Sequence, residues 1–268
     1  MLKALRMDLY RMVRTKSTYI ILAAMIASCA MMIWSFYVTS TAFSSGMMGE
    51  TGVDMDFAAL MPQTVDGYFD AFFQGNFLVL FTVIFTVIFC GAEYKHGYIK
   101  NVASVISRRS GLVISKLICI FIEIIALHAL TVLCIIIGCR GFLGITEVNN
   151  VRGVVLEVIW GILMNLSIAS VIMLLFIIAR KTTLPMVIGI IYVLMGSTVY
   201  SLADLIVEKL FKITDFSVAE YTNMGNMLSY VNSTASQSTL IRSAVVAVVY
   251  LVASAVVSCM LMNKKDVK

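Results

Sequence analysis

The sequence predicts an all-α integral membrane protein with an N-terminal amphipathic interfacial helix and six transmembrane helices. Of its 268 residues, 60% are hydrophobic and 13% are charged, and the mean hydropathy is +0.97. Soluble domains contain about 45–50% apolar and about 25% charged residues, so this composition excludes a soluble globular enzyme. At about 20 residues per span, six helices leave residues for loops but not for a separate soluble domain. Residues 1–268 are therefore expected to form a single transmembrane domain.

Residues 1–18 are expected to form a helix that lies on the membrane surface and then turns into the first span. Apolar residues fall near one helical face, and basic residues fall on the other, which suits lipid headgroups. The apolar set is Leu2, Leu5, Leu9, Met12 and Val13, and the basic set is Lys3, Arg6, Arg14 and Lys16. A cleaved signal peptide is the alternative, but no A-x-A pattern follows the apolar run.

Six apolar segments follow, and each is long enough to cross a membrane as a helix. They cover residues 19–38, 71–92, 112–138, 153–179, 183–203 and 241–262. Pro185 stands at the start of the fifth segment, where its missing N–H costs little. The residues between the fifth and sixth segments, 204–240, are expected to lie outside the cell.

The distribution of basic residues predicts that both termini face the cytoplasm. One side of the predicted membrane holds 15 of the 20 Lys and Arg residues, and by the positive-inside rule this side is cytoplasmic. The segment 39–70, on the opposite side, contains no Lys or Arg but five acidic residues. The net charge of +5 is thus a feature of topology and does not indicate a nucleic-acid partner.

The sequence carries no pattern of an ATPase, a metal site or a catalytic centre. The six cysteines form no CxxC pair, and the two histidines lie in different segments without an HExxH pattern. Walker A and G-x-S-x-G patterns are also missing. We therefore expect no catalytic residue, no metal and no cofactor on this chain, and we expect the cysteines to be small packing residues.

A few polar residues lie within the predicted spans, where they are costly and hence functional candidates. Glu123 and His128 fall in the third span and Asn165 in the fourth. Simple structural hydrogen bonding is the alternative for His128. Glu157, near the outer end of the fourth span, has Arg152 as an available ion-pair partner.

The segment 93–110, between the second and third spans, mixes aromatic, charged and apolar residues in a way that a solvated linker does not require. Tyr94, Tyr98 and Val102 share one helical face at spacings of four. Such a short amphipathic helix either rests on lipid headgroups or docks into a groove of a partner protein.

This segment resembles the permease subunits of type-2 ABC exporters. The resemblance rests on the pattern Glu-x-x-x-Gly-x-Ile-x-Asn from Glu93, on the Ser-Arg pair that follows, and on Lys116 at the entry to the third span. It extends to the plan of an interfacial helix, six spans and a long external segment before the sixth span. His96 and Tyr98 depart from the family, where small or polar residues are frequent at these positions.

The resemblance implies that residues 93–110 form a cytoplasmic coupling segment that contacts an ATPase subunit. The implied contact residues are Glu93, Tyr94, Lys95, His96, Gly97, Tyr98 and Ile99. In relatives, the region that corresponds to residues 204–240 forms short helices that re-enter the outer leaflet. An ordinary surface loop is the alternative for that region.

The expected function is that of the membrane subunit of an ATP-driven exporter in a bacterial plasma membrane. The expected partners are two cytoplasmic ABC ATPase subunits that bind ATP and Mg, a second or homologous permease copy, and membrane lipid. Resemblance to exporters involved in lantibiotic immunity indicates an amphipathic or antimicrobial peptide, or a lipid-like compound, as cargo. Two alternatives remain: a membrane sensor or scaffold that recruits a cytosolic protein without transport, and an intramembrane enzyme that uses Glu123, His128 and Glu157.

Overall fold

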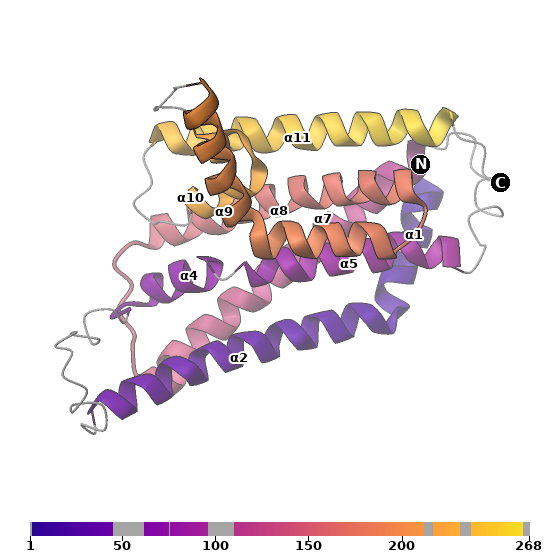
Figure 1. Cartoon of the computed structure of the whole chain (residues 1–268). Coiled ribbons are helices and arrows are strands. Elements are labelled where there is room, and N and C mark those ends of the chain that lie inside the picture. Colours follow the sequence, from indigo (N-terminus) through magenta and orange to yellow (C-terminus); the bar gives the residue numbers. More distant parts are fainter. Residues whose placement is uncertain are drawn as a thin grey trace.

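In the computed structural model, the protein is a bundle of long helices (Figure 1). The structure describes residues 2–44, 62–74, 76–95, 110–211, 217–230 and 237–264. Within these ranges every regular element is helical. The N-terminus and the C-terminal end of α11 (Gln237–Lys264) lie at the same end of the bundle, which we call the α1 end (Figure 1).

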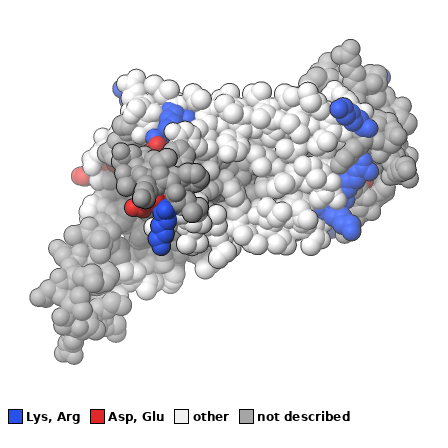
Figure 2. Space-filling view, turned by 45° about the horizontal axis from the view of Figure 1, so that its top comes forward, with Lys and Arg blue, Asp and Glu red and all other residues white. Residues whose placement is uncertain are grey.

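The helix α1 (Leu2–Arg14) runs across the long helices at the α1 end (Figure 1). Four helices of the described ranges are long and apolar enough to cross a membrane: α2 (Lys16–Ser44), α7 (Ser110–Gly138), α8 (Val151–Ala179) and α11. At its end, α7 continues into the short π-helix η1 (Cys139–Leu143). Visible charged side chains lie toward the two ends of the molecule and leave an uncharged band between them on the face in Figure 2.

The second predicted span is a bent pair of helices, α4 (Val65–Gln74) and α5 (Phe77–Lys95), that meet at an angle of 46°. Asn76, at the break, has a φ of 56°, a left-handed conformation that a continuous α-helix does not contain. Residues 65–70, predicted as part of an external loop, are thus helical. The prediction of an unbroken span over residues 71–92 was wrong at this point.

The fifth predicted span is bent within α9 (Thr183–Phe211), between Gly196 and Thr198, by 68°. If each bent pair is one span, the structure has up to six spans, as the sequence predicts. The second arm of α9, the 3-10 helix η2 (Val218–Tyr221) and α10 (Asn223–Tyr230) belong to the region 204–240. A side chain on Gly196 would lie 3.0 Å from Met224 Cγ, so glycine allows α10 to approach the bend.

The core is built from the inward faces of the long helices. On α5, Val79, Val83 and Val87 are fully buried at spacings of four and belong to one cluster with Met164, Ile168 and other residues of α8. A side chain on Gly138 of α7 would overlap the Ile33 side chain of α2, so glycine allows this close approach without a shift of Ile33. The six cysteines are free thiols, as expected from their spacing.

Candidate functional site

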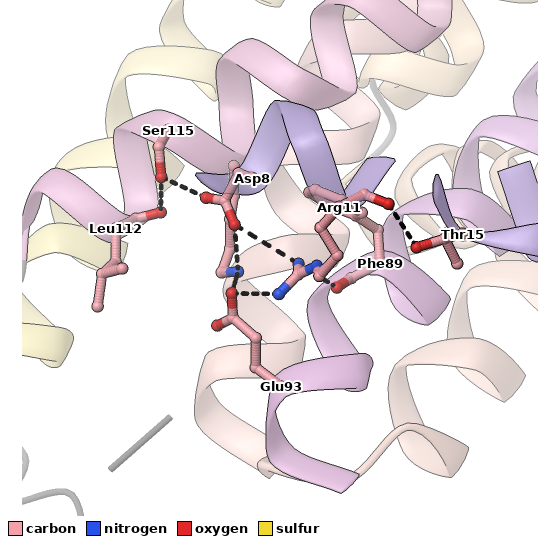
Figure 3. A network of polar contacts seen from close by, with 8 residues as sticks. Asp8, Arg11, Thr15, Phe89, Glu93, Leu112 and Ser115 are labelled. Atoms are coloured by element: carbon pink, nitrogen blue, oxygen red, sulfur yellow. Dashed lines mark hydrogen bonds and ion pairs between the residues drawn. The ribbon is translucent and has the colours of Figure 1, made fainter. Parts of the chain in front are cut away.

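Four charged side chains from three helices meet at the α1 end, and we call them the charge cluster: Asp8 and Arg11 of α1, Glu93 of α5 and Lys116 of α7. Figure 3 labels Asp8, Arg11 and Glu93. Glu93 Oε1 accepts a hydrogen bond from Arg11 Nη1 at 2.5 Å and lies 2.6 Å from Lys116 Nζ. Asp8 Oδ1 lies 3.7 Å from Arg11 Nη2 and 4.0 Å from Lys116 Nζ. Two carboxylates thus face two cations.

The charge cluster is buried. Asp8 is 0% exposed, Glu93 is 2% exposed and Lys116 is 6% exposed. The ring of Phe89, one turn before Glu93, lies beneath both cations, with its centroid 4.6 Å from Arg11 Cζ and 5.6 Å from Lys116 Nζ. Arg11 Nη2 also donates to the Phe89 carbonyl oxygen at 3.1 Å. Removing one of these charges would leave an uncompensated charge in a site with little water.

Asp8 makes one further contact with α7. The hydroxyl of Ser115 donates to Asp8 Oδ2 at 2.6 Å (Figure 3). Burial raises the pKa of Asp8 above the ordinary value of a carboxyl, and the nearby Lys116 ammonium acts in the opposite direction. α1 is therefore held to α7 by Asp8 and to α5 by Arg11.

The corner between α1 and α2 is joined to the same residues. The Arg11 carbonyl oxygen accepts hydrogen bonds from the Thr15 backbone N–H at 2.9 Å and from the Thr15 hydroxyl at 2.6 Å. The Thr18 hydroxyl donates to the Met12 carbonyl oxygen at 2.9 Å. These bonds satisfy carbonyl groups at the C-terminal end of α1 and fix the direction in which α2 leaves it.

The charge cluster lies on both flanks of the segment predicted to contact an ATPase. α5 ends at Lys95 and α7 begins at Ser110, so Glu93 lies three residues before the segment 96–109 and Lys116 follows it within two helical turns. Tyr94 and Lys95 lie in the last turn of α5. His96, Gly97, Tyr98 and Ile99 lie outside the described residues.

The Glu93 side chain points into the protein, where it binds Arg11 and Lys116. Its carboxylate is therefore used within the chain and holds the end of α5 in place. A direct contact of residues 93–99 with an ATPase stays a prediction.

Asp8, the second carboxylate of the charge cluster, was not predicted from the sequence. One signal was available, because Asp8 is the only acidic residue in the first 49 positions, which otherwise carry basic charge. An isolated carboxylate on the inward face of an otherwise basic helix indicates an internal cationic partner. The identity of the partners, Arg11 on the same helix and Lys116 on α7, required the structure.

Of the polar residues predicted within the spans, His128 and Asn165 both lie against Gly161 of α8. His128 is 1% exposed, and its Nδ1 atom donates to the Ile124 carbonyl oxygen at 2.8 Å. Its Nε2 atom lies 3.0 Å from the position that a Cβ on Gly161 would occupy. Asn165 Nδ2 donates to the Gly161 carbonyl oxygen at 2.9 Å. Both side chains thus make structural hydrogen bonds, the alternative that the sequence left open for His128.

Glu123 and Glu157 are each 2% exposed. Within the described part of the chain, no ion pair joins Glu157 to Arg152, the partner that the sequence makes available. No hydrogen bond or ion pair connects Glu123, His128 and Glu157 there either. Among the described residues, no three His, Cys, Asp or Glu side chains are grouped so that they could hold a metal ion.

Comparison with protein families identifies the chain. Residues 11–196 match the model of the ABC-2 family transporter protein. The chain belongs to this family. The matched range includes Arg11, Glu93 and Lys116 of the charge cluster, whereas Asp8 precedes it. No curated protein matches the chain.

Membership of the ABC-2 family makes the chain a membrane permease subunit of an ABC transporter. It is a transport subunit rather than an enzyme, and the family implies a partnership with ABC ATPase subunits. The multi-pass helices agree with this role.

Proposed function

We propose that this ABC-2 permease is the membrane subunit of an exporter that moves an amphipathic or antimicrobial peptide, or a lipid-like compound, out of the cytoplasm or the inner leaflet. Two ATPase subunits would dock at the segment 93–110 and bind ATP and Mg. The observation that carries the proposal is the charge cluster, which ties both flanks of this segment to α1. A segment held at both ends can pass a displacement on to the helices that flank it.

In this mechanism, ATP binding to the ATPase subunits and the movement of the permease helices are coupled in free energy, although the two sites are distant from each other. ATP binding draws the two ATPase subunits together, and the segment 96–109 moves with them. Because Glu93 and Lys116 are paired, α5 and α7 move as one unit and do not separate. Two permease copies then shift against each other as rigid halves, which opens the pathway between them.

An apolar groove between α2 and α7 supports the class of cargo. Its volume is about 460 Å³, and residues such as Ile26, Trp34, Ile137 and Phe142 line it. Such a surface binds hydrocarbon or the apolar face of an amphipathic peptide and offers nothing to a strongly hydrated ion or sugar.

The first experiment is purification of the intact complex from its native membrane in a mild detergent, followed by measurement of its mass. We expect an ABC ATPase to co-purify in stoichiometric amount. A chain that purifies without an ATPase would contradict the proposal and favour the sensor or scaffold function.

The second experiment reconstitutes that complex in proteoliposomes and measures transport of a panel of amphipathic cationic peptides. The matched control carries an inactivated Walker A lysine in the ATPase, which leaves assembly unchanged. We expect ATP-dependent movement of at least one peptide with the active complex only. A complex that hydrolyses ATP but moves neither peptides nor a labelled lipid would exclude this cargo class while leaving the family assignment intact.

A further inference from the structure

α1 has two faces of opposite character. The inward face carries the buried residues Ala4, Asp8 and Met12 together with Arg11. At 100° per residue, the exposed residues fall within an arc of about 100° on the opposite side. These exposed residues are Lys3, Arg6, Tyr10, Val13 and Arg14. We call them the basic face.

The basic face has no counter-charge on its own helix. Asp8 is the only acidic residue of α1, and it is completely buried in the charge cluster. Arg14 is placed over the ring of Tyr10, with 4.9 Å between Arg14 Cζ and the ring centroid. The exposed fractions of Tyr10 and Val13 are 61% and 58%, so cationic and apolar groups alternate along the surface.

This combination fits the headgroup region of a membrane. Lys16, also exposed, begins α2, and α2 is a membrane-spanning candidate, so the basic face lies at the level where the chain enters the bilayer. Basic side chains at this level are attracted to anionic lipid phosphates, and the Tyr ring and Val side chain enter the boundary between headgroups and acyl chains.

We infer that the basic face of α1 binds anionic phospholipid headgroups and that this contact regulates the coupling of the ATPase to the permease helices. The reason is that the opposite face of the same helix holds Glu93. This inference rests on the proposed function. A headgroup that fixes α1 also fixes Arg11 and Asp8. These residues in turn hold Glu93 and Lys116, which flank the ATPase-contacting segment. In a neutral membrane α1 has only its inward contacts, and the segment is positioned less precisely.

The experiment measures the rate of ATP hydrolysis by the complex of permease and ATPase. The complex is placed in nanodiscs of phosphatidylcholine that contain increasing fractions of phosphatidylglycerol. The test variant carries Lys3→Gln, Arg6→Gln and Arg14→Gln. The matched control carries Arg140→Gln, Arg152→Gln and Lys209→Gln. It loses the same number of exposed basic residues at the other end of the spans.

We expect phosphatidylglycerol to stimulate ATP hydrolysis by the unmodified complex and by the control variant alike. The test variant should keep the rate seen in pure phosphatidylcholine and lose the stimulation. Native mass spectrometry measures the affinity of the chain alone for phosphatidylglycerol. We expect this affinity to fall by about fivefold for each basic residue removed.

The outcomes separate this inference from the proposed function. Equal stimulation of the test variant and the unmodified complex would overturn the inference, as would an equal loss in the control variant. Stimulation in pure phosphatidylcholine by added inorganic phosphate would also overturn it, because the site would then bind a soluble anion. Failure of any ATPase to bind the chain contradicts the proposed function instead, and the mass-spectrometric binding of lipid still tests the basic face.

Discussion

Lys116 Nζ lies 2.6 Å from Glu93 Oε1 and so joins the beginning of α7 to the end of α5. The two residues are 23 positions apart in sequence, and the segment 96–109 lies between them. Their pairing fixes the end of α5 and the beginning of α7, the two flanks of this segment, relative to each other. Both partners are almost completely buried, so solvent screens the pair much less than it would screen a surface ion pair.

The first prediction is that Glu93→Gln strongly destabilises the fold. The substitution leaves Arg11 and Lys116 buried beside each other with only Asp8 as counter-charge. We expect the free energy of unfolding to fall by about 3–5 kcal/mol, the usual loss when one partner of a buried pair is removed. Thermal unfolding in detergent measures the change.

The control for Glu93→Gln is Glu220→Gln. Glu220 Oε2 lies 2.6 Å from Arg242 Nη1, a similarly short pair, but the Glu220 side chain is 43% exposed. Its loss should cost at most about 1 kcal/mol. Equal effects of the two substitutions would show that burial does not set the strength of the Glu93 pair.

The second prediction concerns charge balance in the cluster. Asp8→Leu and Lys116→Met each leave one net buried charge, whereas the double variant leaves the balanced Arg11–Glu93 pair. We expect the double variant to lose about 1–3 kcal/mol less unfolding free energy than the sum of the two single losses. A double-mutant cycle of unfolding free energies measures this difference, and additive effects would mean that Asp8 and Lys116 do not interact.

The helices of this protein could be predicted from sequence because hydrocarbon solvent permits few alternatives. A buried backbone must hydrogen-bond within its own helix, so long apolar runs specify spans almost directly. The breaks at Asn76 and near Gly196 were not predicted. Neither site carries proline, and both breaks depend on neighbours: Asn76 adopts a left-handed conformation between two packed helices, and Gly196 allows the approach of Met224.

The candidate site could be predicted only in part. Glu93 was found by its resemblance to a family pattern, but its side-chain direction was not, because a pattern does not distinguish an outward contact from an inward ion pair. Arg11 entered only as one of the basic residues that predict topology, and Lys116 entered as part of the same family pattern, without a partner. Three-dimensional packing brings them to one carboxylate, and residues 82 and 23 positions from Glu93 cannot be paired by spacing alone.

The third prediction tests the close approach of α7 and α8. In Gly161→Ala the new Cβ would lie 3.0 Å from His128 Nε2 and 3.1 Å from Phe73 Cε1. We expect a loss of about 1–3 kcal/mol in the free energy of unfolding, as in other overpacked cores. The matched control is Gly111→Ala in α7, where nothing lies within 4 Å of the added Cβ.

Gly111→Ala should be neutral or stabilising by up to about 1 kcal/mol, because alanine is the better helix former. Chemical or thermal unfolding of both variants gives the comparison. If Gly161→Ala were as stable as Gly111→Ala, His128 and Phe73 would have to move without cost, and the packing of His128 against α8 would not be tight.

The last prediction concerns orientation in the membrane. The positive-inside rule assigns the α1 end to the cytoplasm, since most Lys and Arg residues lie on that side. Three exposed positions report on it: Arg6 in α1, Lys264 at the end of α11 and Arg152 at the start of α8. Each is replaced by cysteine in a background that lacks the six native cysteines, and intact cells are treated with a membrane-impermeant maleimide.

We expect the Arg152→Cys variant to be labelled in intact cells, and Arg6→Cys and Lys264→Cys only after the membrane is permeabilised. This pattern follows because α8 runs from the opposite end of the bundle toward the α1 end, whereas α11 finishes there (Figure 1). The reverse pattern would place the charge cluster and the segment 96–109 outside the cell, away from ATP. It would thereby contradict coupling to a cytoplasmic ATPase at this segment, whereas labelling of all three variants in intact cells would show a disturbed topology.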